Sequence, residues 1–166
     1  SCTTGLHAVL HCLDIKGQEV IVPDYTYPAT AEAVVLAGGI PVLADVDLDS
    51  MNMTSEILDE AYNEKMTVFS PVSWAGVPLE KEIYQKAKKL DLKMLEDAAC
   101  SLGAKINDDY VGKIADYSCF SFHPRKVITT GEGGMITTDN DEMFEKCYSF
   151  KHFGAKGSSF ETIGTN

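Results

Sequence analysis

The sequence predicts a three-layer α/β/α fold with a mostly parallel, mixed sheet. Short runs of β-branched residues alternate with amphipathic helical stretches, which is typical of a parallel sheet covered by helices on both faces. The chain has 166 residues, and 45% of them are hydrophobic, which is enough to bury one sizeable core. We therefore expect one domain over residues 1–166.

The expected elements follow one another along the chain. The runs that favour strands are 19–23, 41–46, 67–72, 93–97, 117–122 and 134–139. The stretches with helical character are 4–15, 28–39, 54–64, 79–91 and 141–153. Thr54 offers a helix cap, and Gly38 with Gly39 offers a helix stop. A loop without a helix joins 117–122 to 134–139, so we expect one of these strands to run antiparallel.

Composition argues against several classes of function. The net charge of −11 disfavours a nucleic-acid partner, because phosphate backbones need a basic surface. No apolar run has membrane-spanning length and no signal peptide is visible, so we expect a soluble, cytoplasmic protein without a membrane partner. The five cysteines show no C-x-x-C spacing and the four histidines are scattered, so we expect reduced thiols and no metal site.

The two ends of the chain suggest a piece of a longer protein. The first residue is Ser1 rather than methionine, and the last segment, "TIGTN", shows no helix cap or tail. We therefore expect a fragment that is truncated at both ends.

Polar and aromatic residues follow the ends of several expected strands. The segments are "DYTY" (24–27), "SWAG" (73–76), "EDAAC" (96–100) and "SFHPRK" (121–126). In open α/β sheets, ligands bind beyond the carboxyl ends of the strands. These segments therefore predict a pocket at one edge of the sheet.

Asp97 and Lys126 each allow an ordinary and a chemical interpretation. Asp97 is either a helix cap or a buried carboxylate whose counter-charge is a cofactor cation, such as a protonated pyridine nitrogen. Most lysines are solvated surface residues. In an apolar pocket with cationic neighbours, however, the pKa of Lys126 would fall and its amine would attack aldehydes. Arg125 fits a surface position better, and His123 fits ordinary packing.

Four further residues or segments are interpreted from their residue types alone. The hydroxyl-rich start Ser1–Thr4 is either an ordinary cap or a phosphate-binding helix start. Tyr27 is either core packing or a ring that lies on a flat heterocycle. The segment "TTGEGG" (129–134) lacks the P-loop and dinucleotide patterns, so its glycines indicate a tight turn with positive φ. Trp74 fits core packing better than contact with a sugar.

In this order, the helix start, the aromatic residue, the "ED" strand end and "SFHPRK…TTGEGG" resemble one family. The chain resembles the DegT/DnrJ/EryC1/StrS family of sugar aminotransferases, within the fold type I enzymes that use pyridoxal 5'-phosphate. The resemblance covers the whole chain, and "SFHPRK" with "GEGG" is its most specific part. It implies that residues 1–166 are the large cofactor-binding domain, without the small C-terminal domain.

The resemblance also implies roles for individual residues. Lys126 matches the lysine that binds the cofactor covalently and moves a proton during amino transfer. Asp97 matches the acid that keeps the pyridine nitrogen protonated. Tyr27 matches the aromatic residue that stacks on the ring, and Ser121 matches the hydroxyl that contacts the cofactor phosphate.

The remaining matches lie near the ends of the chain. Thr3 and Thr4 match residues whose backbone N–H groups hold the same phosphate. Asn166 matches an asparagine that reaches the phosphate of the neighbouring subunit, which implies a homodimer. Two departures stand out: Cys2 replaces a usual glycine, and Cys100 replaces a glutamine or histidine that contacts the ring oxygen, which leaves the role of Cys100 open.

The implied reaction moves an amino group from an amino acid, glutamate or glutamine, to a nucleotide-linked keto-sugar. Such reactions belong to the biosynthesis of amino sugars and cell-surface polysaccharides. One alternative is a sugar dehydratase of the same family, but those relatives have histidine where Lys126 stands. The other alternative is a cofactor-binding fragment that turns nothing over.

Overall fold

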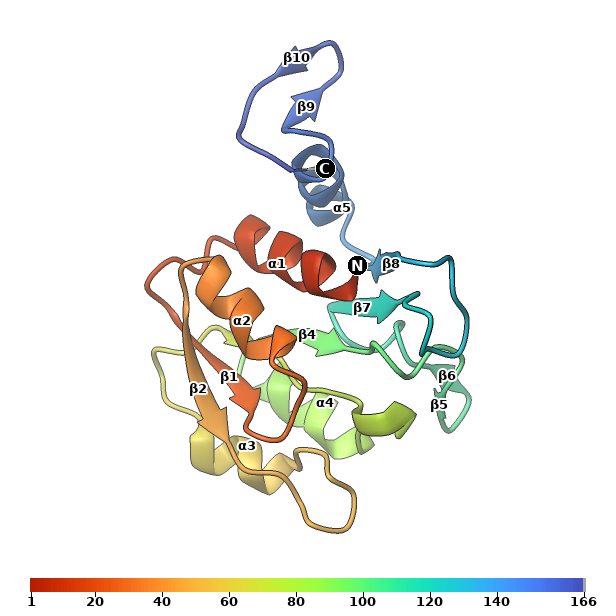
Figure 1. The fold of residues 1–166 in the computed structure, drawn as a ribbon. Coiled ribbons are helices and arrows are strands. Elements are labelled where there is room, and N and C mark those ends of the chain that lie inside the picture. Colours follow the sequence, from red (N-terminus) through yellow and green to blue (C-terminus); the bar gives the residue numbers. More distant parts are fainter. Residues whose placement is uncertain (166) are drawn as a thin grey trace.

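The structure, a computed structural model, describes residues 1–165 and contains a six-stranded sheet with the order β2-β1-β3-β4-β7-β8 (Figure 1). The strands of this sheet are β1 (Glu19–Pro23), β2 (Ile40–Ala44), β3 (Val68–Phe69), β4 (Lys93–Asp97), β7 (Tyr117–Ser121) and β8 (Gly134–Thr137). All neighbours pair in parallel except β7 and β8, which are antiparallel with Ser121 opposite Gly134. The predicted mixed sheet is confirmed.

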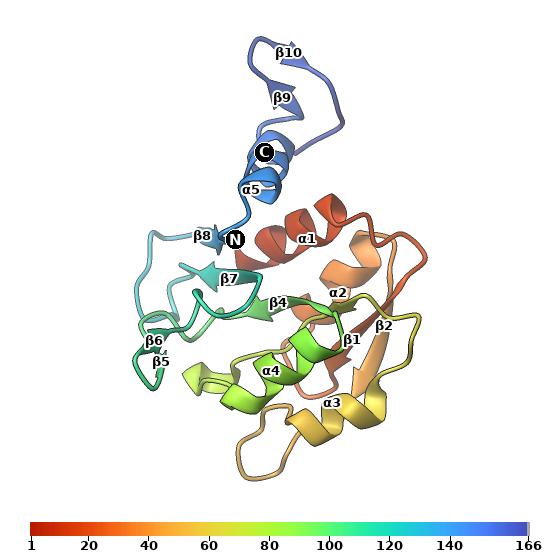
Figure 2. The same cartoon turned by 180° about the vertical axis from the view of Figure 1, so that it is seen from behind.

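Helices cover both faces of the sheet, as predicted (Figures 1 and 2). The helices are α1 (Cys2–Cys12), α2 (Ala29–Leu36), α3 (Ser55–Ala61), α4 (Lys81–Lys89) and α5 (Asp141–Phe150). One core cluster joins α1, α2 and α5 to the sheet, and a second joins α3 and α4 to it. Because side chains alternate along a strand, Val20 and Val22 of β1 enter the first cluster and Ile21 enters the second.

Element boundaries differ from the expected ones where a cap or a proline intervenes. The first helix begins two residues early because the Ser1 hydroxyl accepts the Thr4 N–H at 3.2 Å. The third strand is short because Pro71 has no N–H to donate, and pairing resumes only as a bridge between Val72 and Asp97. Thr54 caps α3 as predicted, and Gly38 has a φ of 81° just after α2.

Two small hairpins were not expected from the sequence. They consist of β5 (Lys105–Ile106) with β6 (Asp109–Tyr110), and of β9 (Ala155–Lys156) with β10 (Ser159–Phe160). The second hairpin lies beyond α5 and projects away from the layers in both views (Figures 1 and 2). Its strands of two residues each are too short to produce a periodic pattern.

The glycine-rich segment after β7 has the expected positive φ at one glycine and a close backbone contact at another. Of its glycines only Gly131 has a positive φ, at 82°, whereas Gly134 has an ordinary backbone conformation. A Cβ atom at Gly134 would lie 2.7 Å from the carbonyl carbon of Ser1 and 2.8 Å from the Cys2 nitrogen. Gly134 therefore allows β8 to approach the start of α1, which lies at the predicted pocket.

We expect Gly134→Ala to destabilise the protein more than Gly103→Ala does. The first change forces a methyl group against backbone atoms, whereas Gly103 has no neighbour within 4 Å and carries only the cost of a positive φ. That conformational cost is about 1–2 kcal/mol for an alanine. Urea denaturation of both variants measures the difference, and an equal or smaller loss for Gly134→Ala would contradict the close approach.

No helix within residues 1–165 is both long and apolar enough to cross a membrane.

Candidate active site

One cavity of about 380 Å³ lies at the carboxyl ends of β4 and β7, within the range of roughly 300–1,000 Å³ that is usual for ligand pockets. It lies where the parallel strands end, as the strand-end rule predicts. Its walls come from the start of α1, from the segments after β1, β3, β4 and β7, and from the loop before β8. The lining residues are Ser1, Cys2, Thr3, Leu6, Tyr27, Ala29, Trp74, Asp97, Ala99, Cys100, Ser121, His123, Arg125, Lys126 and Glu132.

Asp97 is the buried acid of this cavity, with 5% of its surface exposed. Its carboxylate accepts hydrogen bonds from the Thr30 hydroxyl at 2.8 Å and from the Ala99 N–H at 3.1 Å. Burial raises the pKa of Asp97, and these hydrogen bonds together with the Lys126 charge oppose that rise. Within residues 1–165 no Lys, Arg or His nitrogen lies within 4.0 Å of the carboxylate, so no ion pair offsets the cost of burying its charge.

Lys126 brings an amine to the same cavity. Its backbone N–H donates to the His123 carbonyl at 2.9 Å, which holds the turn that follows β7. Its Nζ donates to the Cys100 Sγ at 3.0 Å. The structure therefore brings Lys126, Asp97 and Cys100 together around one space, and it gives Cys100 a contact with the amine.

The start of α1 and the end of β7 provide anion-binding groups at the same cavity. The first N–H groups of a helix have no acceptor within the helix, and Ser1 uses only that of Thr4. The N–H groups of Cys2 and Thr3 are therefore available beside the Ser121 hydroxyl, since all three residues line the cavity. Ser121 is nearly buried and accepts the His123 N–H at 3.3 Å.

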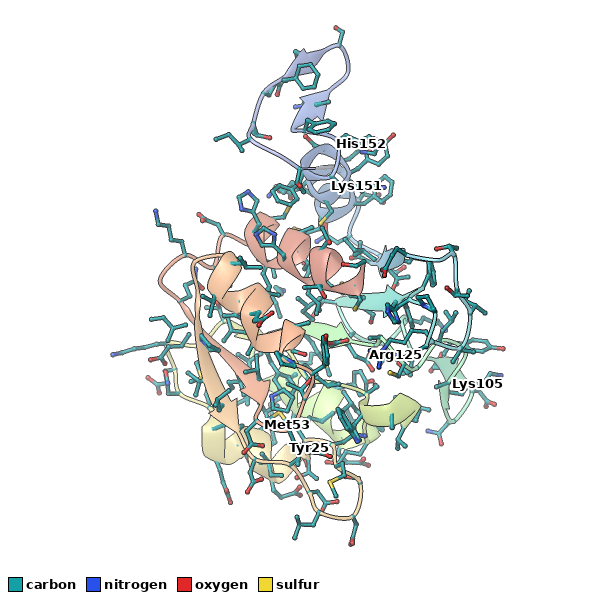
Figure 3. The ribbon with its side chains drawn as sticks, viewed as in Figure 1. Tyr25, Met53, Lys105, Arg125, Lys151 and His152 are labelled. Atoms are coloured by element: carbon teal, nitrogen blue, oxygen red, sulfur yellow. The ribbon has the colours of Figure 1, made fainter. Side chains whose placement is uncertain are left out.

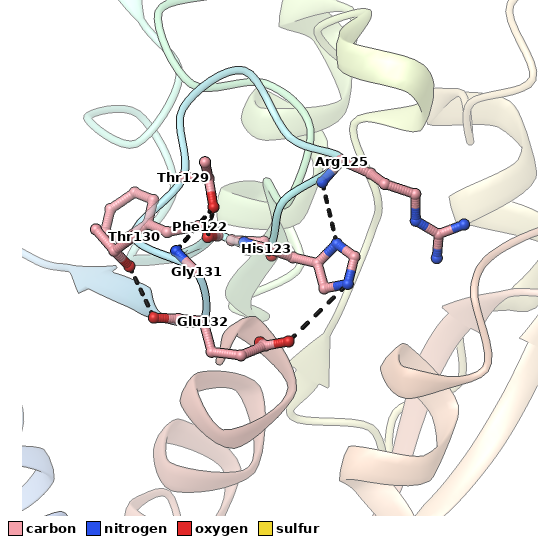
Figure 4. A network of polar contacts seen from close by, with 8 residues as sticks. Phe122, His123, Arg125, Thr129, Thr130, Gly131 and Glu132 are labelled. Carbon is pink, nitrogen blue, oxygen red and sulfur yellow. Dashed lines mark hydrogen bonds and ion pairs between the residues drawn. The ribbon is translucent and has the colours of Figure 1, made fainter.

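A polar network holds the segment between β7 and β8 (Figure 4). The Thr129 hydroxyl donates to the Phe122 carbonyl at 2.9 Å and accepts the Gly131 N–H at 3.0 Å. The His123 Nδ1 accepts the Arg125 N–H at 3.2 Å, while its Nε2 faces Glu132 at 3.9 Å. These contacts give the exposed loop a defined path and position the turn that carries Lys126.

Of the other residues predicted to bind the cofactor, some line this cavity and others do not. Tyr27 lines the cavity with 69% of its surface exposed, so its ring is available to a ligand. Thr3 also lines the cavity, whereas Thr4 lines a separate small hollow and its hydroxyl contacts Ser1 at 2.9 Å. Asn166 lies outside the described residues. Figure 3 shows Arg125 at the edge of the sheet where β4 and β7 end.

Cys2 and Thr30 support the buried acid from beneath, and neither role was predicted. The Cys2 Sγ lies 3.3 Å from the Cys119 carbonyl oxygen and 3.6 Å from Asp97 Oδ1, so its single S–H is shared between these two acceptors. Burial raises the pKa of this thiol well above its ordinary range. Thr30 is a buried hydroxyl residue of α2. A threonine among the apolar residues of this helix was the only sequence signal that could have indicated a buried hydrogen-bond donor.

Glu96, the neighbour of Asp97, points to the opposite face of the sheet. It is fully buried, accepts a hydrogen bond from the Tyr84 hydroxyl at 3.1 Å and is also bonded by the Ser73 hydroxyl. Burial raises the pKa of Glu96, and the hydrogen bonds from the Ser73 and Tyr84 hydroxyls oppose that rise only in part. Glu96 therefore holds Ser73, at the start of the turn that carries Trp74, rather than the ligand of the cavity.

The raised pKa of Glu96 predicts how stability changes with pH. The folded protein keeps the Glu96 proton at pH values where the unfolded chain, with a pKa near 4.5, has lost it. Stability therefore falls as pH rises from about 4.5 through the pKa of the folded state. We expect Glu96→Gln to remove this part of the pH dependence, as measured by urea denaturation across that range.

Glu142→Gln is the matched control for this measurement. Glu142 is exposed and paired with Lys146 at 2.7 Å, which lowers its pKa instead of raising it. Its replacement should leave the slope above pH 4.5 unchanged. Equal slopes for wild type and Glu96→Gln would show that Glu96 is charged in the folded state.

The fold and the cavity define a class of protein. Fold type I pyridoxal-phosphate enzymes require an amine, a buried acid and a helix start that face one pocket of a mostly parallel sheet. Here the amine follows β7, the buried acid ends β4, and α1 starts at the same pocket. The chain belongs to the DegT/DnrJ/EryC1/StrS aminotransferase family, whose model matches residues 1–166.

Within residues 1–165 no three His, Cys, Asp or Glu side chains are grouped to hold a metal ion.

Similar proteins include curated sequences and solved structures. An uncharacterized protein of Methanocaldococcus jannaschii, MJ1066, is 45% identical over 148 residues, which are 88% of this chain and 38% of the relative. GDP-perosamine synthase of Escherichia coli O157:H7 is 37% identical over 154 residues, 92% of this chain and 42% of the relative. The chain thus spans less than half the length of these relatives.

The structural neighbours show the same pattern. PseC of Helicobacter pylori, an aminotransferase of pseudoaminic acid biosynthesis, has a TM-score of 0.93 and 30% identity, with 100% of this chain and 47% of that chain covered. The PLP form of the putative sugar aminotransferase Spr1654 of Streptococcus pneumoniae has a TM-score of 0.89 and 29% identity, with 99% and 49% covered. The expected fold type I architecture is confirmed.

Proposed function

We propose that this chain is the large, cofactor-binding domain, over residues 1–166, of a sugar aminotransferase that uses pyridoxal 5'-phosphate. The observation that carries the proposal is that the Lys126 amine and the buried Asp97 carboxylate line one cavity. Family membership and the neighbour in its PLP form support the same cofactor. No other pair of groups at the rim combines a free amine with an acid that lacks a cationic partner among the described residues.

The groups in the cavity fit this cofactor. When bound, pyridoxal phosphate supplies an aldehyde that accepts amino groups and a ring that delocalises electrons. Asp97 is suited to a protonated ring nitrogen, because its buried charge lacks an ion-pair partner within residues 1–165. The N–H groups of Cys2 and Thr3 and the Ser121 hydroxyl suit a phosphate. Tyr27 offers an exposed ring to cover the heterocycle.

Lys126 performs the proton chemistry in this proposal. Its Nζ would hold the cofactor at the aldehyde group that the cofactor supplies, and the same amine would be the group placed to carry a proton once a substrate is bound. Cys100 holds the amine at 3.0 Å, which keeps it inside the cavity rather than in solvent. A thiol is a weaker hydrogen-bond partner than an amide, so Cys100 positions the amine without trapping it.

The proposed substrates are those that the family resemblance implies. The amino donor is glutamate or glutamine, and the acceptor is a keto-sugar linked to a nucleotide, in keeping with GDP-perosamine synthase. The working unit in this proposal is a homodimer, as the family resemblance implies. All five cysteines are free thiols, which agrees with a cytoplasmic enzyme.

We expect Lys126→Ala to abolish covalent labelling of the protein by pyridoxal phosphate and borohydride. Borohydride reduces a lysine–cofactor bond to a stable product, so peptide mass mapping identifies the lysine involved. Lys113→Ala is the control, since Lys113 is an exposed lysine paired with Asp109 at 2.7 Å. Labelling that persists in Lys126→Ala would refute the assignment of the amine.

We expect Asp97→Asn to weaken cofactor binding about a hundredfold or more. Removing one partner of a buried ion pair costs about 3–5 kcal/mol, and about 1.4 kcal/mol corresponds to a factor of ten. Asparagine preserves the shape and can still accept the Thr30 hydrogen bond. Equilibrium dialysis measures the affinity, and unchanged binding would remove Asp97 from the site.

The reaction itself separates the aminotransferase from a dehydratase of the same family. The protein is incubated with glutamate and a nucleotide-linked keto-sugar, and the products are analysed by mass spectrometry. An amino sugar supports the proposal, and a deoxygenated sugar supports the dehydratase.

A further inference from the structure

A second hollow, of about 260 Å³, adjoins the cofactor cavity. The two spaces share Tyr27, Trp74, Asp97, Ala99, Cys100 and Lys126. The second hollow adds Thr26, Val72, Ser73 and Ala75, and it does not touch the groups that suit the phosphate. It therefore extends the space beside Lys126 away from the groups that suit the phosphate, which leaves room for a reacting substrate.

Trp74 forms a wall of this hollow. The sequence favours packing of Trp74 in the core, but the ring is only partly buried and belongs to neither of the two main core clusters. Its ring centroid lies 4.7 Å from that of Tyr25, which has 49% of its surface exposed. Tyr25 follows β1 (Figure 3). The two rings form a partly exposed aromatic pair, of which Trp74 lines the hollow together with Lys126.

Buried polar groups hold the turn that carries Trp74. Asn52 is 4% exposed, and its Oδ1 accepts the Trp74 N–H at 2.8 Å. The Asn52 Nδ2 donates to the Val77 carbonyl at 3.1 Å, on the other side of the turn. Ser73 is bonded to the buried Glu96. A surface loop needs no such anchors, whereas a rigid binding wall depends on them.

The backbone of the same turn is held in an uncommon conformation. Ala75 has a φ of 52°, although it is not glycine, and Gly76 follows with a φ of 89°. A Cβ atom at Gly76 would lie 2.8 Å from the Cys100 carbonyl oxygen, so the turn packs against the residue that contacts Lys126. Strain of this kind persists where surrounding contacts impose it, and it gathers at functional sites.

We propose that Trp74 is a sugar-binding residue, and that Asn52 is its positioning residue. The occupant of the second hollow is the hexose ring of the nucleotide-linked substrate. The faces of a hexose carry C–H groups that pack against an aromatic ring, while its hydroxyls remain at the rim. The sugar fills this hollow rather than the base, because the reacting carbon of the sugar must lie beside Lys126. This inference rests on the proposed function.

The test separates the sugar from the nucleotide. The probes are GDP-mannose, UDP-N-acetylglucosamine and dTDP-glucose, each compared with its own nucleoside diphosphate by calorimetry on the cofactor-loaded protein. The ratio of the two dissociation constants isolates the contribution of the sugar. We expect at least one conjugate to bind about tenfold more tightly than its diphosphate, and Trp74→Ala to remove most of that advantage.

Three variants control the interpretation. Trp74→Phe keeps an aromatic ring and should retain the advantage to within about twofold. Tyr110→Ala removes an aromatic ring with 53% exposure on the β5–β6 hairpin and should change nothing. Asn52→Ala should lose the advantage although Trp74 is present, and its tryptophan emission should shift to longer wavelength.

Wild-type fluorescence gives a direct readout, because Trp74 is the single tryptophan of the chain. The conjugate should change the emission, and the diphosphate alone should not. The inference fails if the ratio is equal in wild type and Trp74→Ala, or if no conjugate binds more tightly than its diphosphate. Borohydride labelling of Lys126 on the same preparations shows independently whether the proposed function stands.

Discussion

The site depends on keeping one carboxylate buried at the end of a central strand. Asp97 lies beneath the cavity with hydrogen bonds from α2 and from the backbone after β4, and with a thiol of α1 below it. Burial raises the cost of its charge, so the arrangement is stable in the charged form only when a cation lies opposite. The rest of the site follows from that constraint, because the amine, the anion-binding helix start and the exposed tyrosine surround the same space.

The alternation of side chains along β4 divides two tasks between neighbouring residues. Asp97 faces the cavity, while Glu96 points to the other face, where Tyr84 of α4 and Ser73 bond it. One strand end thus supports both the charge that suits the cofactor and the turn that carries Trp74. Burial is the main cause that raises the pKa of Glu96, and the neighbouring charge of Asp97 adds to that rise.

The relatives place this site within a longer protein. The curated relatives are covered over 38% and 42% of their length, and the solved structures over 47% and 49%. The relatives thus match this chain over less than half of their own length. The aromatic wall at Trp74 lies within the matched residues.

The sequence by itself determined the α/β/α class, the order of the main elements, the antiparallel last pairing and the rim segments that line the cavity. Those features depend on local periodicity and on the rule that parallel strands end at one edge. Only the tertiary structure decided that Cys2 and Thr30 support Asp97, that Gly134 makes room for α1, and that Trp74 lines a hollow instead of the core. Each depends on contacts between residues far apart in the chain, such as Asn52 with Trp74 and Thr30 with Asp97. No periodicity in one sequence records which distant side chains meet.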